Sequence, residues 1–474
     1  MKVIRNYLYN AGYQILALIL PLITAPYVSR VLTKHGAGLN AYTNSIVQYF
    51  VLLGSIGIAL YGNREIAYLR NDKHKMSKAF WEIQIIKTFA VIFATILYFV
   101  FLQFYQTNHI LMIFQAINLL AAAFDISWFF MGIEDFKKTV VRNTLVKIIS
   151  LILIFIFIKD SSDLGLYILI LGGSLLVGNL TLWPPLKKYL VKINLSELRP
   201  LRHLRPTITL FIPQVATQVY LVLNKTMLGI MVSSDYSGFY NYADNIVKLV
   251  LALVTATGTV MLPHVANAFA NGEKEKVNQY LYVSFDFVSF LAIAISFGLA
   301  AVGHNLGPYF YGDGYGPVGI AMMIEAPVVT LVGWSNVIGN QYLLPTRKTK
   351  EFSRSVIYGA IANIVINLPF IYFWGLNGAM IATVISEFVV TAYQLNTIKD
   401  VVNIKRLFIN IPKYLLAGVI MFVPVFKMNI GIRTSVASLF FEVLVGIIIY
   451  FVMIFILKPT ILKSGLRLVK KNKH

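Results

Sequence analysis

The sequence predicts an all-α polytopic membrane protein with about fourteen transmembrane helices and both termini in the cytoplasm. Its 474 residues are 58% hydrophobic and only 13% charged, and the mean hydropathy is +0.71. These values lie far outside the range of soluble globular domains. Apolar stretches of about 20 residues, long enough to cross a bilayer, recur along the whole chain. The positive charges gather on alternate connections between them.

The apolar stretches set the bounds of the predicted spans. A cleavable signal peptide would explain only one of them, so we expect the first to be a retained span. The spans lie at about 8–32, 42–62, 82–102, 109–131, 142–158, 164–183, 206–232, 238–262, 280–303, 318–343, 352–373, 378–397, 411–427 and 434–457.

The distribution of Lys and Arg predicts the orientation. Of the 41 such residues, 32 fall on predicted inner connections, four within spans and five on outer connections. This bias places both termini in the cytoplasm and favours an even number of spans. It also accounts for most of the net charge of +21, so the charge requires no nucleic-acid partner. We therefore expect a multi-pass protein of the cell membrane.

The longest polar connection, residues 187–207, divides the chain into two six-helix lobes. The first lobe is predicted at 1–186 and the second at 208–400, followed by two further helices and a basic cytoplasmic tail at 401–474. Four residues of the first lobe recur 200 positions later, where the second helix of each lobe opens. They are Gly38, Tyr42, Ile46 and Val47, matched by Gly238, Tyr242, Ile246 and Val247. Parallel repeats around a central cavity are a common transporter plan.

Cations within the spans are the first candidate site residues. Arg30 ends a first span interrupted by Pro21 and Pro26, and Lys225 and Lys248 lie in the seventh and eighth spans. A cation at the centre of a membrane helix costs about 2.5–3.5 kcal/mol, so such residues usually face a protein interior or a watery cavity. Together they could line a cavity that attracts a phosphate or pyrophosphate.

Two structural alternatives for these cations stay open. Arg30 could extend to the outer headgroups. Lys248 could simply pair with Asp244, which stands four residues before it in the favourable order. Lys87 and Lys147 lie about one turn from the cytoplasmic side, and we expect both to extend their ammonium groups to that interface.

Acidic and amide residues within the spans form a second group. A membrane carboxylate can pair with a cation, or take up a proton or sodium ion that drives transport, and Glu387 is the most central. It could equally be a protonated helix contact. Gln214, Gln218 and Asn224 on the seventh helix predict either a wet face or interhelical hydrogen bonds. The acids are Asp125, Glu325, Glu387 and Glu442.

Catalytic and metal sites are not predicted. The chain has no cysteine, and its seven histidines show no metal-ligand spacing, so we expect neither a metal nor a cofactor. A membrane-embedded sugar polymerase or ligase needs a substantial outer loop, but the longest predicted here, residues 304–317, reads as a tight interfacial turn. The chain is therefore predicted not to be an enzyme.

Four stretches carry a resemblance to a known family. They are NYLYNAGYQILALILPLITAPYVSRVL (6–32), YGNREIAYLRND (61–72), FDISWFFMGIEDFK (124–137) and NKTMLGIMVSSDYSGFYNYADNIVKL (224–249). Their order and spacing resemble the bacterial oligosaccharide flippases of the Wzx type, in the polysaccharide-transporter branch of the MATE-like MOP superfamily. The likeness covers almost the whole chain and is most specific before about residue 260.

The resemblance implies a MATE-like alternating-access transporter in the bacterial plasma membrane. Its substrate would be an undecaprenyl-pyrophosphate-linked oligosaccharide repeat unit, flipped from the inner to the outer leaflet for capsule or exopolysaccharide synthesis. Membrane lipids, a polysaccharide polymerase and assembly proteins would be its partners, and a proton or sodium ion could be coupled. Arg30 and Arg64 map onto the family's motifs and become candidate ligands, beside Lys225 and Lys248. Asp244, Glu325 and Glu387 are candidate coupling or charge partners.

One departure and three alternatives qualify this interpretation. Family members often place an acid before the lysine of the seventh helix, whereas this chain has Asn224 before Lys225. A flippase for lipid-linked peptidoglycan precursor would fit the same pyrophosphate-binding cations. A cationic-drug exporter fits less well, because its cavity should be acidic in the first lobe. A membrane-embedded polysaccharide polymerase is the alternative from another functional class.

Overall fold

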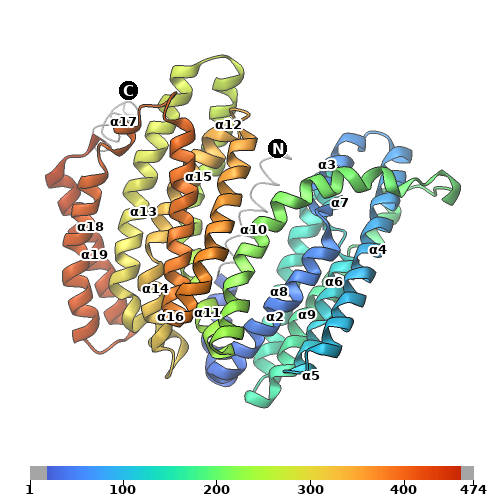
Figure 1. Cartoon of the computed structure of the whole chain (residues 1–474), viewed down its shortest axis with the longest axis horizontal. Helices are drawn as coiled ribbons and strands as arrows, with labels where there is room; N and C mark the ends of the chain where they lie inside the picture. Colours follow the sequence, from blue (N-terminus) through green and yellow to red (C-terminus); the bar gives the residue numbers. More distant parts are fainter. Residues whose placement is uncertain (1–18, 461–474) are drawn as a thin grey trace. The chain divides into compact units, whose positions relative to one another are not determined.

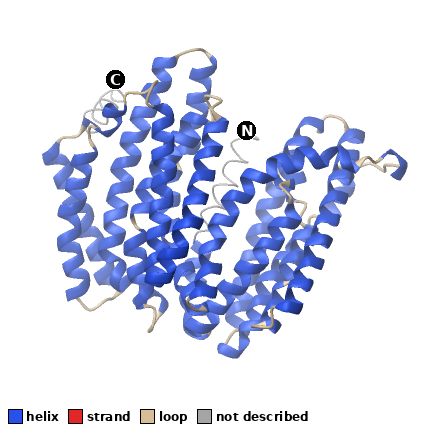
Figure 2. Cartoon of the chain, in the orientation of Figure 1, coloured by secondary structure: helices blue, strands red, loops and turns tan. Residues whose placement is uncertain are grey.

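The computed structural model describes residues 19–460, except the side chains at positions 136, 209, 210, 212–214, 216, 217, 220, 221, 257, 259 and 260. Over this range the chain is helical, with turns and short loops and no strand (Figure 2). Ten helices within it are long and apolar enough to cross a membrane. The prediction of an all-α polytopic membrane protein is confirmed. The first predicted span is described only as the helix Ile19–Val31, and the count of fourteen spans stays a prediction.

The chain folds as two compact units, which meet within one helix of the sequence, at Thr226 and Met227. Each unit is described by itself. Unit 1 continues after the helix Ile19–Val31 with α2 (Thr33–Ser55), α3 (Ile58–Leu69), α4 (Lys73–Phe104), α5 (His109–Gln115), α6 (Ile117–Phe124), α7 (Ser127–Gly132), α8 (Phe136–Phe157), α9 (Leu164–Leu180) and most of α10 (Leu204–Met231).

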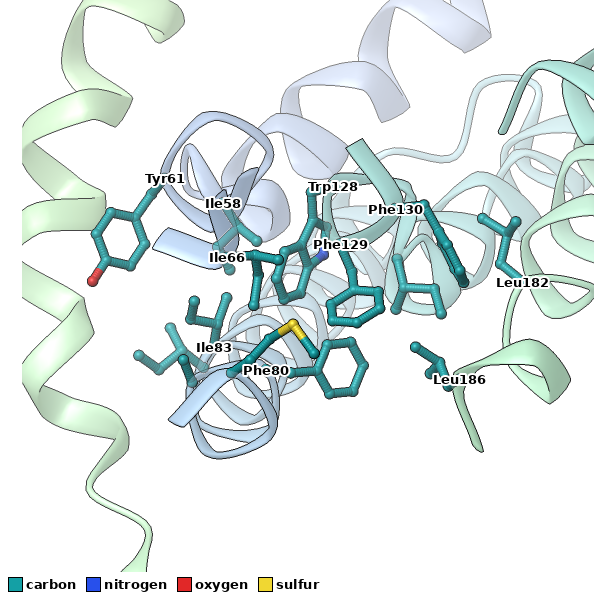
Figure 3. Close-up of a cluster of buried hydrophobic side chains, with 14 residues drawn as sticks. Ile58, Tyr61, Ile66, Phe80, Ile83, Trp128, Phe129, Phe130, Leu182 and Leu186 are labelled. Atoms are coloured by element: carbon teal, nitrogen blue, oxygen red, sulfur yellow. The ribbon is translucent and has the colours of Figure 1, made fainter. Parts of the chain in front are cut away.

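The motifs around Gly62 and Gly132 pack against each other in unit 1. Gly62 of α3 faces the ring of Trp128 in α7, where an added Cβ would stand 2.4 Å from the ring. Gly132 faces Ile66 in the same way, at 2.7 Å. Only glycine lets the two helices approach so closely. Figure 3 shows the apolar cluster that this contact builds, with Phe80 stacked beside the indole.

Three connections that the charge bias assigns to the cytoplasm meet on one face of unit 1. Arg70 forms a salt bridge of 2.6 Å with Glu134, which joins the α3–α4 and α7–α8 connections. The Ser77 hydroxyl accepts a hydrogen bond of 2.9 Å from the backbone N–H of Val191 in the connecting segment 187–207. This common face agrees with the alternation of inner and outer connections along this part of the chain.

The connecting segment is ordered but has little regular helix. It contains the 3-10 turns η2 (Pro184–Lys188), η3 (Leu195–Glu197) and η4 (Pro200–His203) and then enters α10. Prolines at the first positions of η2 and η4 suit short turns, because the missing N–H would have no partner there. Figure 1 shows this segment in green, crossing one end of unit 1.

Unit 2 contains α11 (Ser234–Thr255), α12 (Thr257–Ala270), α13 (Lys274–Tyr311), α14 (Gly316–Glu325), α15 (Pro327–Ile338), the π turn η5 (Gly339–Leu343), α16 (Thr349–Ile398), α17 (Ile404–Phe408), α18 (Ile411–Gly431) and α19 (Val436–Leu457). The predicted spans at 352–373 and 378–397 form α16, which is interrupted where Gly375 takes φ 54° and ψ −124°.

The predicted outer loop at 304–317 is mostly helical. α13 continues to Tyr311, and the turn that follows contains Gly312 and Gly314, both at positive φ. The predicted loop over 304–317 is therefore too long, because only residues 312–315 lie between α13 and α14. Tyr311 and Tyr315 pack against Tyr242, with centroid distances of 4.3 and 5.6 Å, and this packing extends the helix.

The last two helices are fastened to α13 through one acid. The Asp286 carboxylate accepts hydrogen bonds from Asn410 at 2.9 Å and from the Tyr414 hydroxyl at 2.8 Å. Thr460, just after α19, donates to the other carboxylate oxygen at 3.4 Å. The helices at 411–457 thus belong to unit 2 through polar contacts as well as packing.

Candidate functional site

Arg30 lies at the end of the first described helix. Its side chain is exposed, and its Nη1 donates a hydrogen bond of 2.8 Å to the backbone carbonyl of Pro26. The guanidinium therefore folds back along its own helix.

Lys225 lies in α10 beside a polar contact to α2. The neighbouring hydroxyl of Thr226 donates to Ser45 at 2.9 Å and lies 3.1 Å from the hydroxyl of Tyr49. Lys225 itself is half-buried. Ser45 stands twelve residues into α2, which corresponds to about 18 Å along its axis. Lys225 is thus held near the middle of α2.

Arg64 lies in α3, beyond the far end of α2. Its guanidinium lies over the Tyr61 ring, 5.8 Å from the centroid, and it is exposed. α2 has 23 residues and is therefore about 35 Å long, so it separates Arg30 from α3 (Figure 1). The three predicted cations of unit 1 therefore occupy successive levels along α2 and do not form a single cluster.

Lys248 and Asp244 pair within α11 of unit 2. The ammonium Nζ lies 2.6 Å from the Asp244 Oδ2, and the lysine side chain remains 45% exposed while the aspartate is nearly buried. The alternative in which Lys248 pairs with Asp244 on its own helix is therefore the one that the structure shows. The repeated residues Tyr242 and Ile246 are buried on the same helix, as Tyr42 and Ile46 are on α2.

Glu325, at the end of α14, is one of two predicted acids that are almost completely buried, the other being Glu442. Glu325 is 1% exposed, and its Oε2 accepts no hydrogen bond within the described part of the chain. The charged groups that interact with it electrostatically are Asp244, Lys248 and Glu387. The structure therefore brings Asp244, Glu325 and Glu387 together around one lysine, on three different helices, α11, α14 and α16.

The polar residues predicted on the seventh helix do not share one environment. Asn224 is 1% exposed, whereas Gln218 is exposed. The side chain of Gln214 lies outside the described residues. Among the described side chains, a continuous wet face along α10 is therefore not formed.

The expectation that Lys87 reaches the interface is wrong. Lys87 is 4% exposed, and its Nζ donates to the backbone carbonyl of Asp125, where the chain leaves α6. Three preceding carbonyls within residues 121–124 accept hydrogen bonds from Asn179 (2.6 Å), Gln84 (3.2 Å) and Trp183 (2.9 Å). A helix end inside a membrane needs such partners, because no water is available for its last carbonyls.

The sequence analysis did not identify a buried network around Glu82. This glutamate of α4 is 0% exposed, and its carboxylate accepts hydrogen bonds from the Arg199 backbone (2.6 Å), Arg202 Nε (2.8 Å) and His203 Nε2 (2.8 Å). The other ring nitrogen of His203 lies 2.5 Å from the Tyr61 hydroxyl, which points away from the apolar cluster in Figure 3. The sequence feature that could have indicated this network is a glutamate at the predicted cytoplasmic end of a span, in a chain whose connecting segment is rich in arginine.

Among the described residues, His, Cys, Asp and Glu form no group of three or more that could hold a metal ion. Two groups of ionisable residues stand out. In unit 1 they fasten the connecting segment to α4, and in unit 2 they surround Glu325.

Comparison with solved structures identifies the fold. The chain superposes on the "Lipid II flippase MurJ, inward closed conformation" with a TM-score of 0.75 and 17% identity, covering 98% of this chain and 99% of that one. It also matches an inward-facing multidrug resistance MATE family transporter of the MOP superfamily, with a TM-score of 0.63 and 13% identity, covering 81% and 95% of the two chains. The predicted MATE-like fold is confirmed.

Comparison of sequences identifies the family. The chain is 24% identical to the "Putative O-antigen transporter" of Shigella dysenteriae over 385 residues, which is 80% of this chain and 96% of that protein. Residues 3–269 match the family described as "Polysaccharide biosynthesis protein", and the match includes the α3 and α7 motifs that pack through Gly62 and Gly132. With more than half of its length matched and the transporter fold in place, this multi-pass membrane protein belongs to the polysaccharide biosynthesis protein family.

Proposed function

We propose that this chain flips undecaprenyl-pyrophosphate-linked oligosaccharide repeat units from the inner to the outer leaflet of the bacterial cell membrane by alternating access. The product would feed capsule, exopolysaccharide or a related surface polymer, and a polymerase would take it over. The observation that carries this proposal is the relation to the Shigella dysenteriae protein, which extends over 80% of this chain and 96% of that relative. The fold shared with a lipid II flippase supports it.

The cations of unit 1 suit an anionic head that moves along the membrane normal. Arg64, Lys225 and Arg30 lie at successive levels along α2 and α3, and α2 alone is about 35 Å long. One pyrophosphate would therefore contact them in turn. Each contact would offset part of the free energy that the pyrophosphate loses when it leaves water. Because the cations are separated, none of them would bind the pyrophosphate too tightly for it to move on. An arginine at each end can form a two-pronged contact with phosphate, whereas lysine acts as a point charge.

The acids of unit 2 suit a coupling role. Asp244, Glu325 and Glu387 would carry three negative charges against the one positive charge of Lys248. A carboxylate as buried as Glu325, with one oxygen lacking a hydrogen bond, is stabilised by a bound proton or cation. We assign the exchange of a proton or sodium ion to this group. An inside-negative potential would also favour outward movement of the head, by about 2.3 kcal/mol per charge per 100 mV.

The direct test is flipping in proteoliposomes. The fraction of lipid-linked oligosaccharide that a membrane-impermeant glycosidase can reach would be compared for the native chain, Arg30→Gln, Lys225→Gln and the exposed control Arg433→Gln. We expect the native chain and the control to expose the sugar and the two site variants to lose at least tenfold in rate. If the native chain never flips the lipid, the function is wrong; if both site variants flip normally, the assignment of the cations is wrong.

A second arm tests coupling and the alternative substrate. Glu325→Gln should still flip its substrate but lose the response to an imposed proton or sodium gradient. A native chain indifferent to voltage and to both gradients would refute coupling. Rescue of a strain that lacks its lipid II flippase would show that peptidoglycan precursor is also carried; we expect no rescue.

A further inference from the structure

An apolar groove opens on unit 1 where the connecting segment crosses α4. Its volume is about 550 Å³, and every lining residue is aliphatic, proline or phenylalanine. We call it the linker groove. Its walls come from α2, α4, η4 and α10, and include Ile56, Ile85, Phe89, Phe93 and Leu201.

The depth of the linker groove matches one leaflet of a bilayer. Trp81, 38% exposed, lies four residues before Ile85 on α4, and exposed tryptophan is typical of the headgroup level. From Ile85 to Phe93 the groove extends about 12 Å along the helix, within the roughly 15 Å of hydrocarbon in one leaflet. Phe89 and Phe93 are 70% and 57% exposed, so the groove is open to the surface of the protein.

The rim of the linker groove is cationic. Arg199 and Arg205 are exposed and stand on either side of the groove-lining residues Pro200, Leu201 and Leu204. Leu201 is 79% exposed and stands directly before Arg202. Exposed leucine between exposed arginines is typical of a segment that lies in the membrane interface and attracts anionic lipid.

The Glu82 network fixes this rim in place. Arg202 forms a salt bridge of 2.5 Å with Glu82, so its positive charge is compensated within the protein. Glu82 also accepts the Arg199 N–H at 2.6 Å, which holds the backbone of the rim within one helical turn of Ile85 and Ile86. The two flanking arginines are therefore presented on a fixed backbone.

We propose that the linker groove binds one anionic phospholipid of the cytoplasmic leaflet, with an acyl chain in the groove and the phosphate on Arg199 and Arg205. The apolar lining excludes a soluble anion, and the cationic rim favours an anionic headgroup over a zwitterionic one. The 12 Å of the groove lie within one leaflet, which is also where the acyl chain of a cytoplasmic-leaflet phospholipid lies. This site is separate from the proposed path for the sugar and does not depend on it.

The test uses the purified full-length chain in detergent, titrated with phosphatidylglycerol or with phosphatidylcholine of the same acyl chains. Native mass spectrometry counts the bound lipids, and the thermal unfolding midpoint reports their effect on stability. We expect one tightly retained phosphatidylglycerol and a raised midpoint, with neither effect from phosphatidylcholine. Equal binding of the two lipids would overturn the proposal.

Matched variants locate the site. Arg199→Gln with Arg205→Gln should weaken phosphatidylglycerol binding about 30-fold, the factor expected for two lost cation contacts at a lipid surface. Lys188→Gln with Lys192→Gln removes the same charge from exposed positions of the same segment and should change nothing. Equal weakening in both pairs would mean diffuse attraction and would refute a built site.

Two further arms test the occupant. Ala90→Phe fills the linker groove and should abolish retention of the lipid; if that variant does not fold, the arginine pair, which is exposed, still decides the matter. Undecaprenyl phosphate at equimolar concentration should not displace phosphatidylglycerol. Displacement would assign the groove to the carrier and overturn the phospholipid assignment.

Discussion

Removal of the Glu82 carboxylate should release the connecting segment from α4. Glu82→Ala removes the acceptor of three hydrogen bonds, of which those from Arg199 and His203 come from buried or backbone groups. Truncating one partner of a buried charge pair costs about 3–5 kcal/mol. Arg202 is 48% exposed and can return to water, so we take the lower part of that range, about 3 kcal/mol.

Two milder variants set the scale for this change. Glu82→Gln keeps one carbonyl for the Arg199 N–H and can donate to a neutral His203, so it should lose about 1.5–3 kcal/mol, the value of one hydrogen bond to a charged group. Arg202→Gln removes a half-exposed partner and should cost no more than about 1 kcal/mol. The order of stability should therefore be native, Arg202→Gln, Glu82→Gln and Glu82→Ala.

The assay is thermal unfolding of the detergent-solubilised chain, combined with limited proteolysis of the connecting segment. Glu82→Ala should lower the unfolding midpoint most and should speed cleavage between residues 187 and 207. If Glu82→Ala is as stable and as resistant to protease as Arg202→Gln, the buried network does not hold the segment, and the reasoning fails.

Two more variants test the packing of each unit. Gly62→Ala would place a Cβ about 2.4 Å from the Trp128 ring, so we expect a loss of about 1–3 kcal/mol by overpacking, read as a lower unfolding midpoint. Gly431→Ala, where nothing lies within 4 Å, is the matched control, and equal midpoints for the two would contradict the close contact of α3 and α7. Asp286→Ala removes the acceptor shared by three donors at the base of α18 and α19. This pair of helices should then be the first part of unit 2 to open, which would be measured as faster amide hydrogen exchange over residues 411–457. Unchanged exchange there would mean that apolar packing alone holds the two helices.

The membrane class of this chain was predictable because it depends on composition summed over long stretches. Burial of about 20 apolar residues per span outweighs any local preference, so the presence of membrane helices follows from hydropathy. The bias of Lys and Arg likewise needs no tertiary information, since each charge acts separately at the membrane surface. The pair of Asp244 and Lys248 was also within reach, because a spacing of four fixes two side chains on one helix face.

Other features depend on contacts between helices that are distant in sequence. The depth of Lys87 in its span predicts a position at the interface. In the structure its ammonium instead donates a hydrogen bond to a backbone carbonyl at the end of α6. Glu82 and His203 stand 121 residues apart, and no periodicity connects them. The gathering of Glu325 and Glu387 around the α11 pair likewise required α14 and α16 to pack nearby.

The sequence by itself determined the membrane class, the all-helical fold and the family, and it predicts the orientation, because these depend on local hydropathy, charge and motif. Only the tertiary structure decided which polar groups meet: the spacing of the cations along α2, the acids around Glu325, and the network that ties the connecting segment to α4. The physical reason is that a charge inside a membrane protein is stable only beside a partner, and that partner comes from whichever helix packs against it.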